Sequence, residues 1–258
     1  MSAASIELQL NPQAQYLLRV GDTCLILAQR LGEWCGHAPI LEEDIAMSNI
    51  ALDLIGQARA LLTRAGEIEG RQHDEDQLAF LRNERDYFNL TMVELPRGDF
   101  AFSVLRNTMV STWLKLLWER LGQSSDHEVR AIAGKALKEA RYHQQHSGDW
   151  VVRLGDGTDE SRQRMEAALA QLWRYASELF DTDPIDEQAS AEGIGPLWSE
   201  LQAPWKAEME LILGEAGLAV PADSAFRSDG KRGRHSEHMG FILADMQYLQ
   251  RSFPGGVW

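Results

Sequence analysis

Apolar residues recur every three or four positions through most of the chain, which is the spacing of amphipathic helices. The pattern is clearest in the first long segment, which follows Asn11-Pro12 and carries one continuous apolar stripe. The members of that stripe are Leu17, Val20, Cys24, Leu27, Leu31 and Trp34. No stretch alternates with a period of two between turn signals, so no strand is predicted. The pattern therefore predicts an all-α protein.

Residues that cap or stop helices mark the predicted ends. Asn11-Pro12, Asp99 and the capping-box pattern from Ser125 to Glu128 predict three starts, and Gly70 predicts a stop. The predicted helices cover residues 12–36, 42–69, 76–95, 99–122, 125–155, 160–180 and 236–251, with a further helix that is interrupted at Pro204 and ends near Gly217. Residues 181–195 and 218–235 are predicted loops. About eight helices of roughly 25 residues with short connections predict one antiparallel bundle, about 37 Å long, over residues 1–258.

Composition narrows the choice of partners and compartment. The net charge of −14 argues against nucleic acid and anionic membranes, because both repel an acidic surface. Met1 to Leu10 has no signal-peptide pattern, and the longest apolar run is far shorter than the roughly 20 residues that span a bilayer. Cys24 and Cys35 fall in one predicted helix at about 16 Å, too far apart for a disulfide. We expect a reduced, cytoplasmic protein without a membrane span.

The candidate chemistry lies in the segment Lys138 to His146. Glu139 and His143 are four residues apart and share a helix face. Helical bundles hold metal pairs with Glu on some helices and Glu-x-x-His on others. Here the residue three positions before His143 is Ala140, which has no ligand atom. The spacing therefore indicates a metal site that has lost a ligand.

The same test applied to the other long helices gives few ligands. The six positions compared are Glu33, Asp53, Gly56, Ser111, Ala140 and His143. Gly56 stands where Glu-x-x-His needs histidine, and Ser111 stands where an acid is needed. Only Glu33, Asp53 and His143 can bind metal, too few for two iron ions, so we predict no metal and no catalytic residue. We expect those three side chains to lie together between helices, paired with one another or with a cation such as Lys115.

Spacing alone leaves three alternatives for Glu139, His143 and His146. They could form a solvated helix face, a buried polar cluster with its hydrogen bonds satisfied, or a working metal site. A second cluster lies in the predicted loop before the last helix, and it contains Arg227, Lys231, Arg232, Arg234 and His235. This loop could contact a phosphate of coenzyme A or an acidic patch on a partner, or it could be solvated surface.

Several segments of the chain are similar to a known family. They are residues 31–39, 52–59, 138–143, 172–174 and 233–238, and, most closely, Met246-Gln247-Tyr248-Leu249-Gln250-Arg251. These segments resemble the C-subunit (PaaC) family of the ring-1,2-phenylacetyl-CoA epoxidase complex. The resemblance covers nearly the whole chain from Tyr16.

The resemblance implies a ferritin-like fold and a structural, non-catalytic subunit beside a homologous di-iron A subunit. It also implies a small B subunit and an iron–sulfur flavin reductase, in a monooxygenase complex that uses oxygen and NADPH to epoxidise phenylacetyl-CoA during phenylacetate catabolism. No cofactor is implied on this chain. Against the family pattern of the A subunit, Glu33 and Asp53 match ligand positions, whereas Gly56, Ser111 and Ala140 have replaced a histidine, a carboxylate and a glutamate. The alternatives are an autonomous di-iron carboxylate oxidase and a helical acyl-CoA-binding module.

Overall fold

The computed structural model describes residues 5–256, so Met1 to Ala4 of the predicted polar N-terminus lie outside it. The α-helices are α1 (Pro12–Gly32), α2 (Leu41–Ile68), α3 (Glu75–Phe80), α4 (Phe100–Leu121), α5 (His127–Gly155), α6 (Asp159–Leu172), α7 (Pro184–Ala191), α8 (Gln202–Glu215) and α9 (His238–Ser252). Five short 3-10 helices lie between them, at Glu84–Asp86, Thr91–Glu94, Trp173–Phe180, Trp198–Leu201 and Gly230–Arg232. The described part of the chain is 71% helical and has no strand, which confirms the all-α prediction.

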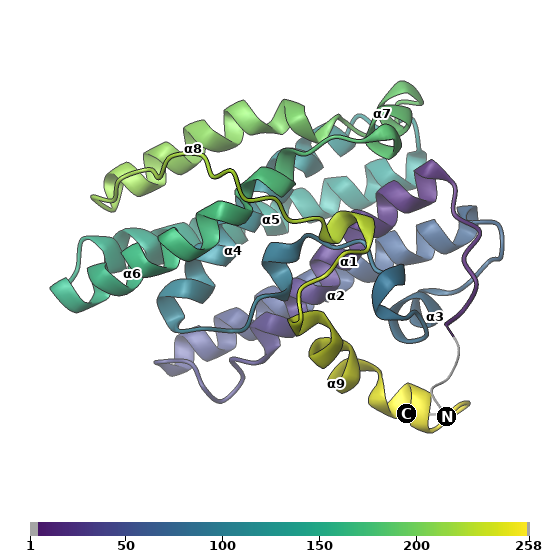
Figure 1. Cartoon of the computed structure of the whole chain (residues 1–258), viewed down its shortest axis with the longest axis horizontal. Helices are drawn as coiled ribbons and strands as arrows, with labels where there is room; N and C mark the ends of the chain where they lie inside the picture. Colours follow the sequence, from purple (N-terminus) through teal and green to yellow (C-terminus); the bar gives the residue numbers. More distant parts are fainter. Residues whose placement is uncertain (1–4, 257–258) are drawn as a thin grey trace.

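Four long helices form the bundle (Figure 1). α1 packs along α2, α4 packs along α5, and α2 also contacts α5. Segments later in the chain cover α1 and α4: α7 lies against α1, and α6 and α8 lie against α4. We call α1 and α4 the inner pair, and α2 and α5 the outer pair. This arrangement is a ferritin-like bundle, as the resemblance implied.

The helix starts follow from local capping, as predicted at two of three sites. The Asn11 side chain accepts a hydrogen bond from the Ala14 N–H, with Pro12 in the first turn. Asp99 accepts in the same way from Phe102 N–H. At α5 the cap is Asp126, whose carboxylate accepts from the N–H groups of Glu128 and Val129. Ser125 lies one residue too early and instead donates to the Glu192 carbonyl at 3.0 Å.

The predicted helix over residues 76–95 is wrong. Only α3 and two short 3-10 turns form there. Phe88 N–H donates to the Asp22 carboxylate at 2.9 Å, and Leu90 N–H donates to the Thr23 hydroxyl at 3.2 Å. These bonds to α1 take the place of the backbone hydrogen bonds of a helix, so tertiary contacts override the local helical pattern.

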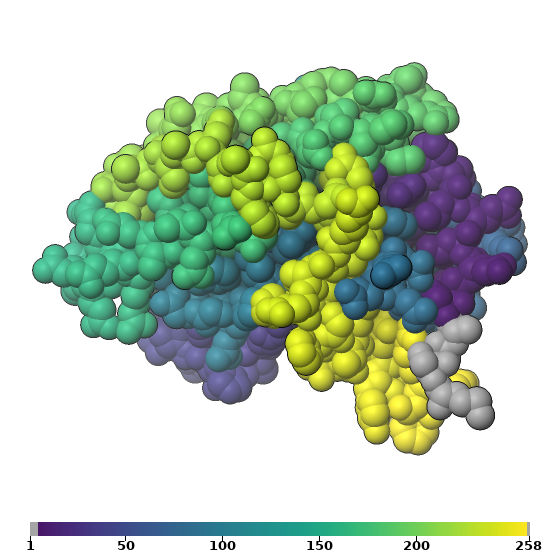
Figure 2. All heavy atoms as spheres, viewed as in Figure 1, coloured from purple at the N-terminus to yellow at the C-terminus, as the bar shows by residue number. Residues whose placement is uncertain are grey.

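Residues 218–237, which we call the strap, run from α8 to α9 across the face of the molecule shown in Figure 2. The strap is largely irregular, as predicted, apart from the short turn at Gly230–Arg232 and an isolated bridge between Asp229 and Arg234. α9 then extends away from the bundle toward the chain ends (Figure 1). The loop prediction over residues 181–195 missed α7, although Asp183-Pro184 supplies both its cap and its first-turn proline.

The core contains several tryptophans and one of the two cysteines. Trp198 and Trp205 are fully buried, and Cys24 is buried, whereas Cys35 is exposed; both cysteines are free. By length and composition alone, α2 is the one helix among residues 5–256 that could cross a membrane, and 44% of its most apolar window is buried. Core helices pass the same test, so this is weak evidence for a membrane span.

Candidate functional site

His143 lies at the junction of α2 and α5. Its side chain is 1% exposed, and its Nε2 is 3.0 Å from the Asp53 carboxylate, which is 40% exposed. Burial lowers the pKa of His143 more than the bond and charge of Asp53 raise it. The imidazole is therefore neutral at pH 7, with Nε2–H donating to Asp53. The structure thus brings together two of the three predicted ligands.

Other polar residues extend this contact along both helices. Gln57 donates to Glu139 at 3.0 Å, and the Cys24 thiol donates to the Gln57 amide oxygen at 3.7 Å. His146 and Glu43 approach to 3.0 Å. We call this cross-helix set the polar seam: Glu43, Asp53 and Gln57 of α2 with His146, His143 and Glu139 of α5. Each member bonds across the junction, so the geometry is that of a satisfied polar cluster.

Glu33, the third predicted ligand, is elsewhere. It caps the C-terminal end of α1, its carboxylate lies 2.5 Å from Arg30 Nη1, and its side chain is 40% exposed. The cation beside it is Arg30 and not Lys115. Lys115 instead pairs with Glu208 of α8, and Gln144 donates to that same carboxylate. The structure therefore does not bring Glu33 or Lys115 to the polar seam.

The three substituted positions differ in their surroundings. Ser111 is buried in α4, and its hydroxyl donates to the Asn107 carbonyl at 2.6 Å. Ala140 is fully buried on α5. Gly56 is exposed, and a β-carbon built there would have no other atom within 4 Å. Gly56 therefore faces solvent, whereas Ser111 and Ala140 face the interior.

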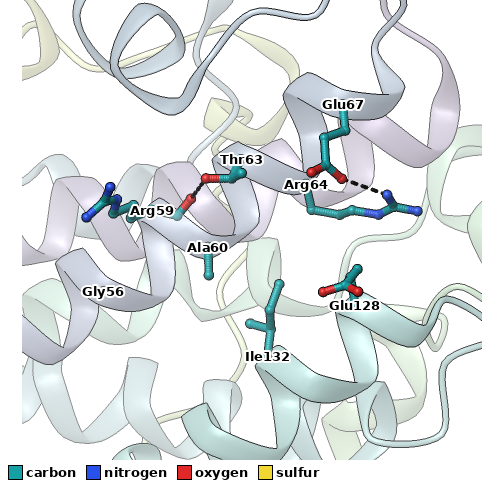
Figure 3. A pocket seen from close by; sticks show the side chains of 8 residues that line it. All are labelled: Gly56, Arg59, Ala60, Thr63, Arg64, Glu67, Glu128 and Ile132. Carbon is teal, nitrogen blue, oxygen red and sulfur yellow. Dashed lines mark hydrogen bonds and ion pairs between the residues drawn. The ribbon is translucent and has the colours of Figure 1, made fainter.

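Gly56 lines a groove of about 350 Å³ between α2 and α5 (Figure 3). Ala60 and Arg64 of α2 face Ile132 and Glu128 of α5 across it. Arg64 bonds to Glu67 at 2.7 Å and to Asp126 at 2.7 Å, so this cation of the groove is already paired within the chain. The groove shows that Gly56 lies at the surface between the helices, away from the apolar centre.

A pair of iron ions in this fold would need carboxylates from all four helices. In place of those carboxylates, α4 offers the Ser111 hydroxyl, already bonded to its own helix, and α5 offers the methyl group of Ala140. Among residues 5–256, no group of three or more His, Cys, Asp or Glu side chains is placed to hold a metal ion. The donors present do not fit a di-iron centre, and we derive no step through one.

Each of the three alternatives for the basic loop requires exposed cations, and Lys231 does not meet this requirement. Lys231 is fully buried, and its ammonium lies 2.8 Å from the Asp186 carboxylate of α7. Arg19 of α1 binds the same carboxylate at 2.8 Å and Asp183 at 2.7 Å. The expectation of exposure is wrong for Lys231, because α7 carries acidic partners that the loop's own sequence does not reveal.

Two buried carboxylates hold the rest of the strap. Glu178 accepts from the backbone N–H groups of Thr91 and Lys231, both at 3.0 Å, and burial raises the pKa of Glu178. Glu94 accepts from His235 Nδ1 at 2.6 Å and from Ser236 N–H at 2.7 Å. Sequence reasoning missed both acids, since neither has a motif and each binds strap residues far away along the chain.

His235 is held between two acceptors. Its other ring nitrogen, Nε2, lies 3.0 Å from the Tyr87 carbonyl, and the side chain is fully buried. Burial alone lowers the pKa of His235, but the bond to Glu94 and its charge outweigh burial, so the pKa is raised. Because a carbonyl and a carboxylate both accept, the imidazole that fits this position carries both protons.

The other loop cations are closer to solvent. Arg232 bonds to Asp183 at 2.9 Å and to Asp229 at 2.6 Å, with its side chain 34% exposed. The Arg234 side chain is 82% exposed. Arg227 is exposed and lines a cleft of about 100 Å³ with Arg174 and Lys206. Arg227, Arg232 and Arg234 are all exposed, and Arg232 differs from the other two because it pairs with Asp181, Asp183 and Asp229.

The chain matches the family model described as phenylacetic acid catabolic protein over residues 1–258. It is also 51% identical over 249 residues to a relative from Escherichia coli (strain K12), the C subunit of 1,2-phenylacetyl-CoA epoxidase. That match covers 96% of this chain and 100% of the relative. The two matches confirm the resemblance drawn from the sequence segments.

Proposed function

The chain belongs to the phenylacetic acid catabolic protein family, and from this premise we propose that it is the structural, non-catalytic subunit of a 1,2-phenylacetyl-CoA epoxidase complex. The observation that carries the proposal is the donor set of the bundle. The positions that we assign from the sequence to a former di-iron centre include Ser111, Ala140 and a His143–Asp53 pair that is already hydrogen-bonded. A bundle without the ligands for oxygen chemistry would serve the complex by holding another subunit in place.

The remaining components of the reaction would then lie on other chains. A homologous catalytic subunit would carry the di-iron centre, and a reductase would carry flavin and iron–sulfur groups and oxidise NADPH. The proposed hetero-oligomer also includes a small third subunit, and we place it in the cytoplasm. This chain would hold none of these cofactors.

Contact with phenylacetyl-CoA or with an acidic patch of a partner is proposed only for Arg227 and Arg234. Both side chains are exposed, so a phosphate or carboxylate could reach them without opening the strap. We leave Lys231 and Arg232 out of this proposal, because Lys231 is buried against Asp186 and the Arg232 guanidinium already binds Asp183 and Asp229. The Arg227→Ala/Arg234→Ala double variant should weaken thioester binding or assembly, and the loss should diminish at high salt.

The test is co-expression with the homologous catalytic subunit, followed by co-purification and metal analysis of each separated chain. We expect a stable complex at micromolar concentration that buries more than the ~1,600 Å² of a standard interface. Iron should follow the catalytic subunit, with far less than one iron per molecule of this chain. Separate migration of the two chains would refute the scaffolding role.

Measurements on the isolated chain distinguish the two alternative functions. Two tightly bound iron ions, released together by His143→Ala, would indicate an autonomous di-iron oxidase. Affinity for coenzyme A thioesters without any partner would indicate an acyl-CoA-binding module. We expect neither iron retention nor oxygen-dependent turnover from this chain alone.

A further inference from the structure

The outward face of α2 carries an apolar row that nothing in residues 5–256 covers. Leu41, Ile45, Leu52 and Ile55 are 72%, 54%, 64% and 39% exposed. With Ser48 and Arg59 they are spaced four, three, four, three and four residues apart. That is the heptad spacing with which one helix packs against another. We call these six residues the α2 row.

The row is unusual within this molecule. Exposed apolar side chains arranged in a row mark contact sites more reliably than scattered ones. On α5 beside it, Tyr142 is 53% exposed and stacks on His146, which extends the apolar area toward the polar seam. A heptad row in which four of the six side chains are aliphatic fits a second helix, because side chains of one helix insert between those of the other.

The row is self-complementary about its midpoint. If two copies of α2 pack antiparallel with their centres at position 50, residue i faces residue 100 − i. Ile45 then faces Ile55 of the other copy, Ser48 faces Leu52, and Leu41 faces Arg59. A two-fold interface requires this property, since each surface must complement itself.

Charge selects the antiparallel orientation. The first turn of α2 is acidic, with Glu42 and Asp44, whereas Arg59 stands at the other end of the row. Antiparallel packing brings Arg59 of one copy to the acidic turn of the other. Parallel packing would place acid beside acid and Arg59 beside Arg59. Arg59 is 73% exposed and its ion pair with Glu75 lies at the surface, so little free energy is lost when it turns to another acid.

We propose that the α2 row is the contact surface for a second copy of this chain, packed antiparallel about a two-fold axis near residue 50. The row is about 27 Å long from Leu41 to Arg59 at 1.5 Å per residue. A standard interface needs about 800 Å² from each partner, so the flanking surface of α5 at Tyr142 would also be buried. The inference does not depend on the proposed function, because it concerns pairing of the isolated chain with itself.

The first test is the mass of the isolated full chain by sedimentation equilibrium between 1 and about 100 μM. We expect a dimer whose dissociation constant rises at least ~100-fold in Ile45→Glu, because the substitution occurs twice in each dimer. The matched control is Phe241→Glu on α9, which is 71% exposed and lies outside the row. It should leave the dissociation constant within about twofold. A monomeric wild-type chain, or a dimer that Ile45→Glu does not weaken, would overturn the proposal.

The second test concerns orientation and uses the Cys35→Ser background, because Cys35 is exposed. A mixture of Ile45→Cys and Ile55→Cys chains should form a disulfide between copies, since those positions face each other. Ile45→Cys alone should not, because its two copies would lie about 15 Å apart along the axis. Efficient cross-linking of Ile45→Cys with itself would overturn the antiparallel arrangement.

Charge exchange provides an independent check on the same orientation. Glu42→Arg and Arg59→Glu should each weaken the dimer several-fold, and the double variant should recover to within about twofold of wild type. Additive losses in the double variant would contradict the pairing of these ends. The second-copy proposal also fails if the wild-type chain is a monomer and Ile45→Glu abolishes the binding of a different subunit. The α2 row would then be the contact surface for that subunit.

Discussion

The inner pair of helices and the outer pair are both long but have very different surroundings. Sixteen of the 21 residues of α1 and 18 of the 22 residues of α4 are buried. In α2 only 11 of 28 are buried, and in α5 only nine of 29. Later segments of the chain cover the inner pair, whereas the outer pair keeps one side open. Other segments of this chain thus cover the inner pair, but they leave one side of the outer pair exposed.

Charged groups show the same contrast. Asp22 of α1 and Arg82 are both fully buried and bond to each other twice, and Asp22 also accepts from Phe88 N–H. In the outer pair, Asp53 is 40% exposed while it bonds to His143. A buried ion pair loses much more than an exposed one when a partner is removed, because the remaining charge cannot be hydrated. The inner pair therefore fixes the fold, and the outer pair is free to serve contacts.

The same substitution in each layer tests this contrast with the largest expected effect. Asp22→Ala should lower the free energy of unfolding by about 3–5 kcal/mol, because Arg82 would be left charged and buried. Asp53→Ala should cost about 1 kcal/mol, because only one hydrogen bond to a neutral His143 is lost. Urea denaturation followed by circular dichroism measures both. Equal losses would remove the distinction between the layers.

The strap offers a second comparison within one loop. Lys231→Ala should cost about 2–3 kcal/mol, less than breaking the Asp22 pair, because Arg19 still neutralises Asp186. Arg234→Ala, in the same loop and 82% exposed, should stay within about 0.5 kcal/mol. Thermal or urea unfolding of both variants provides the measurement. A negligible effect of Lys231→Ala would mean that its buried bonds do not stabilise the strap.

Local signals were sufficient to predict most of the helices. The caps at Asn11 and Asp99 and the apolar stripes gave α1, α2, α4 and α5 to within a few residues, because those signals are short-range. The failures have long-range causes. Within residues 76–95, backbone N–H groups bond to Asp22 and Thr23 of α1 and do not form a helix. No local sequence pattern reveals these long-range bonds.

The site was predictable to the same degree. The Glu-x-x-His spacing pointed to His143, and the same test on the second predicted helix pointed to Asp53. These two side chains do contact each other. Glu33 was assigned as the acid of the first predicted helix, but that helix ends there and the carboxylate bonds to Arg30. The burial of Lys231 depends on Asp186 of α7, 45 residues away, so the basic composition of the loop could not reveal it.

Two histidines, one under the strap and one in the outer pair, should make the folding stability depend on pH in opposite directions. The pKa of His235, under the strap, is raised, so the folded state binds its proton more tightly than the unfolded state does. Its stabilisation is complete below the unfolded value of about 6.5 and is lost as pH rises through the folded pKa. The pKa of His143, in the outer pair, is lowered, so stability falls as pH drops below about 6.5.

Unfolding free energies of His235→Gln and His143→Gln between pH 5 and 8.5 separate these contributions. Relative to wild type, His235→Gln should lose the decline on the alkaline side, and His143→Gln should lose the decline on the acid side. Each unit of pKa difference corresponds to about 1.4 kcal/mol. Unchanged pH profiles in both variants would show that neither histidine titrates differently in the folded state.

The smallest expected effect concerns Gly56, which the sequence places among lost metal ligands and the structure places on the open side of the outer pair. A glycine in the middle of a helix costs roughly 0.5–1 kcal/mol relative to alanine. Since a β-carbon at Gly56 would meet nothing within 4 Å, Gly56→Ala should raise the free energy of unfolding by about that amount. Gly56→His should be equally well tolerated and should leave iron binding unchanged, because its ring would enter the surface groove and not the interior. Iron analysis and urea denaturation of both variants test this. If Gly56→His increased iron retention, this position would face the bundle centre, and the open side of α2 would have to be assigned again.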